Sequence, residues 1–164
     1  MFNIDEINKE DKESFYKDLM LYLEGLLSDE EDWLANLSNA AALLYNMMDR
    51  INWAGFYLLK GSDLVLGPFQ GKPACTRIPI GKGVCGTAAE KRQVQLVEDV
   101  DRFPGHIACD PASRSEIVLP IIVDDRLHGV LDIDSPIKAR FDHKDAAGLE
   151  DFVSILCGSI KWPL

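Results

Sequence analysis

The 164-residue chain is short of positive charge and of long apolar runs. It has 17 basic against 27 acidic residues, a formal net charge of −10. This balance argues against nucleic acid as a partner, because phosphate binding requires a basic surface. No apolar run approaches the roughly 18 residues of a membrane span. The first residues, MFNIDEINKEDKE, lack the basic and apolar regions of a signal peptide. We therefore expect a cytoplasmic protein that does not act at a membrane.

Cysteine and histidine are also scarce, with four and three residues. The cysteines are Cys75, Cys85, Cys109 and Cys157. They form no Cys-x-x-Cys pair, the spacing typical of a zinc knuckle. In a reducing compartment, such cysteines are more often buried, metal-binding or redox-active than part of a static disulfide framework. Repeats and low-complexity tracts are absent too, so the length predicts one domain over residues 1–164.

The apolar pattern predicts helices at both ends of the chain and hairpins between them. The expected helices cover residues 15–27, 28–48, 81–92 and 142–162. Ser28 and Glu31 predict a capping box for the second helix, and Asp142 predicts the N-cap of the last. The hairpins are expected to turn at 61–63 and 124–125, with short strands at 76–80 and 93–100.

Tight hairpins favour a largely antiparallel sheet, and helices from both ends of the chain can cover one of its faces. The second helix has an apolar stripe for this contact, formed by Trp33, Leu34, Leu37, Ala41, Leu44 and Met48. The other face is left for loops and a pocket. We therefore predict an α+β fold: a central antiparallel sheet with helices packed on one face and a loop-covered pocket on the other.

Each cysteine has a different sequence context. Cys75, in GKPACT, and Cys109, in GHIACDP, lie in loop sequence, where functional residues concentrate. Two loop thiols in a reducing compartment suggest a pair that opens and closes. Cys85 begins a short helix, where either a lowered thiol pKa or simple packing explains it. Cys157 lies on the apolar stripe of the last helix, which indicates a core residue.

Two other kinds of site use the same residues. A zinc site would take His106, Cys109, Cys75 and Cys85 as ligands, but the spacing argues against it. A thiol hydrolase would pair Cys109 with a histidine base, yet no orienting Asn or Asp stands in a recognisable context. We give both interpretations little weight.

Three acidic residues and two aromatic residues form a second candidate group. Glu116 begins one strand, and Asp132 and Asp134 alternate along its hairpin partner, so the two aspartates face the same side. Three acids in one pocket repel one another, so at least one should hold a proton near neutral pH. Such a group can bind an ammonium ion and also donate a proton. Trp53 and Tyr57 would face one side of the first strand as an aromatic wall. Solvated strand ends and ordinary core remain the alternatives.

Four motifs together resemble one known family: INWAGFYLL, LGPFQGKPACTRIPIGKGVCGTA, FPGHIACDPASRSEIVLPI and GVLDIDS. They closely resemble the free methionine-(R)-sulfoxide reductases, enzymes built on a single GAF domain. The resemblance runs from about Asp32 to the last helix. Residues 1–30 lie outside its strongest part and are expected to form an N-terminal helical extension.

The resemblance implies a role for three of the cysteines. Cys109 matches the nucleophile, which attacks the sulfoxide and becomes a sulfenic acid. Cys75 matches the main resolving cysteine, which then forms a disulfide with Cys109. Cys85 matches a third cysteine that can join or substitute in disulfide formation.

The resemblance also implies the substrate site and the reductant. Glu116 belongs with the catalytic residues, and Asp132, Asp134, Trp53 and Tyr57 line the substrate pocket. The substrate would be free methionine-(R)-sulfoxide, with no metal and no bound cofactor. Thioredoxin, kept reduced by NADPH-dependent thioredoxin reductase, would recycle the disulfide, and the role would lie in oxidative stress. The oligomeric state stays open, with a homodimer among the options.

A second function is compatible with the same fold. A sensory GAF domain would bind a small ligand such as a cyclic nucleotide without chemistry, and fold alone does not separate the two. The cysteine pair and the three carboxylates do, because a nucleotide site needs donors for phosphate rather than acids.

Overall fold

The computed structural model describes residues 7–163, so the first six residues and Leu164 of the predicted domain lie outside the described residues. The helices are α1 (Lys12–Leu27), α2 (Trp33–Met47), α3 (Gly83–Lys91), α4 (His143–Ser159) and the 3-10 turn η2 (Val100–Arg102). The strands are β1 (Trp53–Lys60), β2 (Asp63–Gly71), β3 (Arg77–Pro79), β4 (Gln95–Val97), β5 (Ser115–Val123) and β6 (Arg126–Ser135). No helix within 7–163 is long and apolar enough to cross a bilayer.

The strands form one antiparallel sheet in the order β3-β2-β1-β6-β5-β4. The β5–β6 hairpin turns at Asp124 and Asp125, both in the left-handed region with φ of 50° and 63°. This is the geometry of the two-residue turn that best suits twisted antiparallel strands, and aspartate tolerates it. The predicted α+β fold is therefore confirmed.

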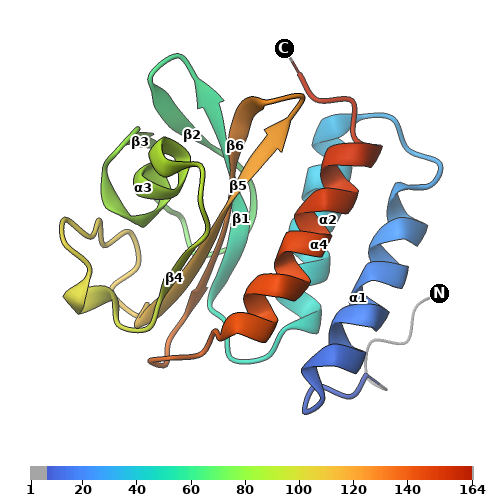
Figure 1. The fold of residues 1–164 in the computed structure, drawn as a ribbon, viewed down its shortest axis with the longest axis horizontal. Coiled ribbons are helices and arrows are strands. Elements are labelled where there is room, and N and C mark those ends of the chain that lie inside the picture. Colours follow the sequence, from blue (N-terminus) through green and yellow to red (C-terminus); the bar gives the residue numbers. More distant parts are fainter. Residues whose placement is uncertain (1–6, 164) are drawn as a thin grey trace.

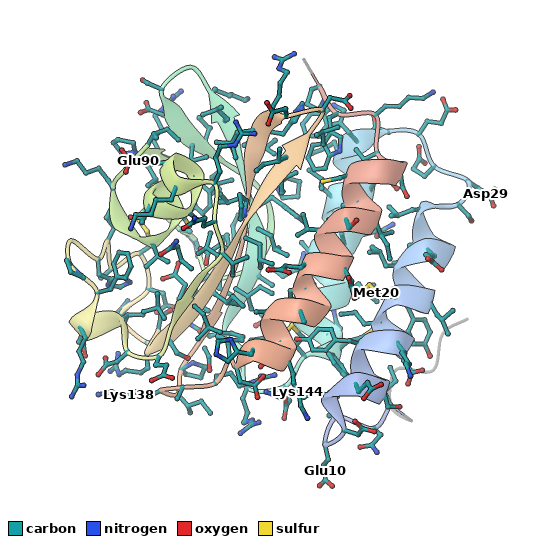
Figure 2. All side chains as sticks on the ribbon, in the orientation of Figure 1. Glu10, Met20, Asp29, Glu90, Lys138 and Lys144 are labelled. Atoms are coloured by element: carbon teal, nitrogen blue, oxygen red, sulfur yellow. A yellow bond between two sulfur atoms is a disulfide. The ribbon has the colours of Figure 1, made fainter. Side chains whose placement is uncertain are left out.

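Helices cover one face of this sheet in two tiers. In Figure 1, α2 and α4 lie next to the sheet and α1 lies outside them. Tyr16 on α1 donates a hydrogen bond of 2.8 Å to the buried Asp145 on α4. Gly148 leaves room for the Tyr16 ring, since a Cβ there would lie 2.2 Å from the ring. Figure 2 shows the side chains that fill these layers, with Asp29 and Lys138 at the periphery.

The opposite face of the sheet carries α3 and the long loops (Figure 1). Because side chains alternate along a strand, β1 sends Phe56 toward the helices and Trp53 and Tyr57 toward α3. Val118 and Val130 point the same way from β5 and β6. The sheet thus separates two hydrophobic clusters, and the one under α3 contains the residues predicted to form a site.

Four predictions about local structure were wrong. Helix α2 begins with Asp32 as its N-cap, because the Asp32 side chain accepts from Ala35 N at 2.8 Å. Ser28 instead ends α1, and Glu31 is exposed and pairs with Lys161 at 2.7 Å.

Leu34 lies in the first turn of α2 with 49% of its surface exposed, rather than on the packed face. The expected ranges 15–27 and 28–48 make the first helix the shorter one, whereas α1 has 16 residues and α2 has 15. The strand expected over 93–100 is only three residues long. The N-cap at Asp142 is confirmed.

Candidate functional site

Strand register brings the three acids into one place. Glu116 on β5 pairs with Asp134 on β6, and Asp134 pairs in turn with Trp53 on β1. Asp132, two residues before Asp134, pairs with Gly55 and faces the same side. A Cβ on Gly55 would lie 2.3 Å from Phe69 Cβ, so glycine is needed for the aromatic side chains to pack here.

A pocket lies over these strands, beneath the long loops and beside α3. The predicted residues that line it are Trp53, Tyr57, Cys85, Cys109, Glu116, Asp132 and Asp134. Cys75 itself packs at the edge of the same hydrophobic cluster. The structure therefore gathers every predicted site residue at one location.

Burial dominates the electrostatics of this pocket. Glu116 and Asp132 are only 5% and 6% exposed. Loss of hydration, and then the charge of Asp134, raises the pKa of Glu116 to about 8. Burial raises the pKa of Asp132 well above its usual range, and Glu116 adds to the effect. The pKa of Asp134 is raised in the same way, by burial first and by Asp132 second. Glu116 therefore keeps its proton at neutral pH, and burial disfavours ionisation of the two aspartates as well.

The Asp132 carboxyl group shares hydrogen bonds with the side chains of Glu116 and Cys85. Among residues 7–163, no donor outside this group reaches its buried Oδ1. The three side chains therefore satisfy one another only while protons are shared among them.

Cys85 is buried against the same acids, and its Sγ lies 3.9 Å from Glu116 Oε1. Its position at the beginning of α3 does not lower the pKa of its thiol. Burial, reinforced by Asp132 and Glu116, raises that pKa well above the ordinary value. Of the two explanations left open for Cys85, the structure favours packing, with the thiol protonated in this state.

The two loop cysteines are joined. Cys75, between β2 and β3, forms a disulfide with Cys109, between η2 and β5, with their Cα atoms 5.5 Å apart. This bond removes both sulfurs from the zinc set and leaves no free Cys109 thiol for a hydrolase in this state. Cys157 packs half-buried against the helix-side core, as its place on the apolar stripe predicts.

Trp53 and Tyr57 of β1 both contact the segment that carries Cys75. Their rings stack with centroids 5.9 Å apart. The Trp53 indole donates to Lys72 O at 3.2 Å, and the Tyr57 hydroxyl donates to Cys75 O at 2.9 Å. The predicted aromatic wall thus also holds a loop, a contact that the sequence pattern does not reveal.

Two polar residues of the site have contacts that the sequence does not reveal either. The sequence suggests His106 only as a metal ligand or base, yet its Nε2 lies 3.6 Å from Glu116 Oε2. Burial lowers the pKa of His106, which favours the neutral ring there. Asn52 donates to Asp110 and to Ser113, each at 3.1 Å, and so anchors the Cys109 loop to the beginning of β1. The only signal for Asn52 is its place in the INWAGFYLL motif.

A metal ion has one candidate set among residues 7–163. Donor atoms of Cys85, Glu116 and Asp132 all lie within 4.8 Å of one another. All three groups are buried and have raised pKa values. Because a metal ligand must give up its proton, a cation at this place would have to displace the protons that these groups hold without it.

Comparison with known proteins agrees with this geometry. The GAF domain family matches residues 21–160. The free methionine-R-sulfoxide reductase of Escherichia coli (strain K12) is 56% identical over 145 residues, 88% of each chain. The enzyme of the same name from Saccharomyces cerevisiae is 47% identical over 153 residues, 88% of this chain and 85% of that protein. A structure of the Neisseria meningitidis enzyme in complex with its substrate superposes with a TM-score of 0.88. It has 48% identity and covers 91% of this chain and 90% of that one.

The fold and the family match define the protein as a GAF domain. Within that class, the chain belongs to the free methionine-(R)-sulfoxide reductases, which are oxidoreductases.

Protonation of the pocket predicts how stability depends on pH. The pKa of Glu116 is 4.5 when unfolded and about 8 when folded, so between these values the folded state holds a proton that the unfolded state has lost. The free energy of unfolding should therefore fall as pH rises through this window, by up to about 1.4 kcal/mol per unit from this group. Urea unfolding of the oxidised protein from pH 5 to 8 measures it.

Glu116→Gln should make this slope less steep, since an amide does not titrate and only the two aspartates of the group still contribute. Glu150→Gln, at an exposed position on α4, serves as the matched control and should leave it unchanged. Equal slopes in the wild-type protein and Glu116→Gln would show that Glu116 is already ionised in the folded protein.

Proposed function

We propose that the chain reduces free methionine-(R)-sulfoxide to methionine, using its own thiols, in the reducing cytoplasm. One observation carries this proposal: the Cys75–Cys109 disulfide adjoins a pocket lined by three buried carboxyl groups. The relatives named for this reaction support it.

The first step needs a nucleophile and a proton. Cys109 is the proposed nucleophile, and its thiolate attacks the sulfoxide sulfur. A sulfoxide is a weak electrophile until its oxygen is protonated or strongly hydrogen-bonded. The buried carboxyl groups can supply that proton, and Glu116 is suited to it because its pKa of about 8 keeps it protonated at pH 7. Oxygen passes to Cys109 as a sulfenic acid, and methionine leaves.

The second step removes the sulfenic acid. The Cys75 thiol attacks the Cys109 sulfur, a disulfide forms, and the oxygen leaves as water. Support comes from the same two sulfurs being bonded in the structure. Cys85 is the reserve thiol in this scheme, although its raised pKa makes it a slow nucleophile in this state.

The cycle ends when an external dithiol reduces the disulfide. We assign this role to thioredoxin, recycled by NADPH-dependent thioredoxin reductase, so that the enzyme itself needs no bound cofactor. The exchange transfers two electrons and two protons and restores both thiols.

The acids also explain why the substrate would be a free amino acid. Asp132 and Asp134 are the proposed partners of the ammonium group, and Trp53 and Tyr57 would bound the side-chain end of the pocket. An entering cation lowers the pKa of nearby carboxyl groups. One acid can then ionise to bind the ammonium group while another keeps the proton needed by the sulfoxide. No donor outside the group of Glu116, Cys85 and Asp132 reaches Asp132 Oδ1, so an ammonium group can replace the shared proton there.

The pocket gives less support to a sensory role. Nucleotide binding requires hydrogen-bond donors or cations for phosphate. The pocket lining includes Lys72 and His106, but its three buried acids would repel a phosphate group.

Cysteine variants separate the two chemical steps. Cys109→Ser should lose all turnover, because a hydroxyl is a far weaker nucleophile toward sulfur. Cys75→Ser should produce about one methionine per enzyme and then stall with thioredoxin, leaving a trappable sulfenic acid on Cys109. Cys157→Ser, on the other side of the sheet, is the control and should cycle normally. Thioredoxin-dependent turnover by Cys109→Ser would refute the assignment of the nucleophile.

A blocked substrate tests whether the pocket acids recognise the free ammonium group. Free methionine-(R)-sulfoxide and its N-acetylated, C-amidated analogue are compared under the same reductant. The blocked compound leaves a buried carboxylate facing a neutral amide, so kcat/KM should fall about a thousandfold or more. Comparable rates for the two compounds would mean that the acids do not recognise the ammonium group.

A further inference from the structure

The segment that carries Cys75 lies between two strands without belonging to either. Residues 72–76 connect β2 to β3, and residues 72–75 are called here the Cys75 segment. They follow Gly71, which has φ of +130°. A Cβ on Gly71 would lie 2.6 Å from the Trp53 ring. The segment therefore leaves β2 at a position that suits glycine and passes directly over the aromatic side chains of β1.

Two side-chain donors hold the two ends of the Cys75 segment. Trp53 donates to the carbonyl of Lys72, and Tyr57 donates to the carbonyl of Cys75 itself. Both rings are fixed, since each is 2% exposed and Trp53 also stacks on Phe69 with centroids 5.2 Å apart. Next to the segment, Thr76 O accepts a hydrogen bond of 3.0 Å from Leu66 N of β2. Within residues 72–75, donors on the rigid strand β1 can thus set the position of the loop.

We propose that Trp53 and Tyr57 are positioning residues for the resolving cysteine. Their hydrogen bonds form as the Cys75 segment closes over the pocket, and they hold Cys75 against Cys109. The proposal rests on the proposed function, because it assumes that Cys75 resolves a sulfenic acid on Cys109. It gives the aromatic pair a role in the second step of the reaction, beyond lining the substrate pocket.

The size of the pocket indicates that methionine leaves before the Cys75 segment closes. With the disulfide formed, Lys72, Pro73 and Ala74 line a cavity of only ≈ 40 Å³. That is room for about three water molecules, too little for methionine sulfoxide. Closure of the segment therefore occupies the space that the substrate needs, so methionine leaves before Cys75 reaches its bonded position.

The test removes one hydroxyl and keeps the ring. Tyr57→Phe loses the bond to Cys75 O, and a hydrogen bond of ordinary strength changes the closure equilibrium about fivefold. The Cys75–Cys109 disulfide should then be less stable, and its reduction potential should rise by about 20 mV. Equilibration with a glutathione or dithiothreitol redox buffer measures the potential without any substrate.

The same variant is then followed through a single turnover. Reduced enzyme is mixed with free methionine-(R)-sulfoxide, and released methionine and the Cys75–Cys109 disulfide are quantified over time. The rate of disulfide formation should fall about fivefold relative to the rate of methionine release. The reason is that the Cys75 segment is closed in a smaller fraction of the enzyme molecules. Trp53→Phe, which loses the bond to Lys72 O, should act in the same direction. Tyr45→Phe removes a hydroxyl from an exposed tyrosine on α2 and should change neither quantity.

The outcomes separate this proposal from the proposed function. An unchanged potential in both Tyr57→Phe and Trp53→Phe would overturn the positioning role, as would methionine release that slows as much as disulfide formation. A general loss of packing would destabilise both redox forms equally and leave the potential where it was. Failure of the wild-type enzyme to release methionine would refute the proposed function, while the potential would still decide whether the hydrogen bonds stabilise the disulfide.

Discussion

Three carboxyl groups share one buried pocket, and the rest of the site depends on this constraint. Register between β5 and β6 places Glu116 beside Asp134, and the alternation of side chains adds Asp132 on the same face. Charged carboxylates so close together and away from water would repel and lose hydration, so the group retains protons at neutral pH. A single solvated carboxylate would provide neither the cation-binding site nor the proton reservoir that this arrangement creates.

The disulfide and the pocket share one wall, and this links redox state to substrate access. The sheet fixes the acids and the aromatic rings, whereas the two cysteines lie on loops anchored from that sheet. Asn52 holds the Cys109 loop, and Tyr57 holds the Cys75 segment. A rigid platform with two tethered loops permits thiols to meet and separate while the acids stay in place.

Much of the fold and of the candidate site could be predicted from local sequence pattern. The alternation of Asp132 and Asp134 and the hairpin around Asp124 are enough to predict the acid face, and the apolar stripe of α4 identifies the helix layer. Loop context suggests that Cys75 and Cys109, separated by 34 residues, form a pair. Their roles as resolving cysteine and nucleophile follow only from the family resemblance, because spacing does not determine them. In the run SDEED, several residues can cap a helix, so propensity alone does not identify Asp32, whose side chain accepts from Ala35 N in the structure. Burial of Cys85 by the acids, and the bond from Tyr57 to Cys75, depend on how distant strands and loops come together. A register shift in the β1–β2 pairing between Gly55 and Tyr57 adds a local irregularity that alternation alone does not reveal.

The protonation of the three acids is the central claim, and carbon-detected NMR of labelled carboxyl groups measures it directly. Titration of the oxidised protein, with Glu116, Asp132 and Asp134 assigned by conservative amide variants, gives an apparent pKa for each coupled step. The account predicts that at least one of the three carboxyl groups keeps its proton at pH 7, with Glu116 titrating near 8. Complete ionisation of all three groups by pH 6 would contradict it.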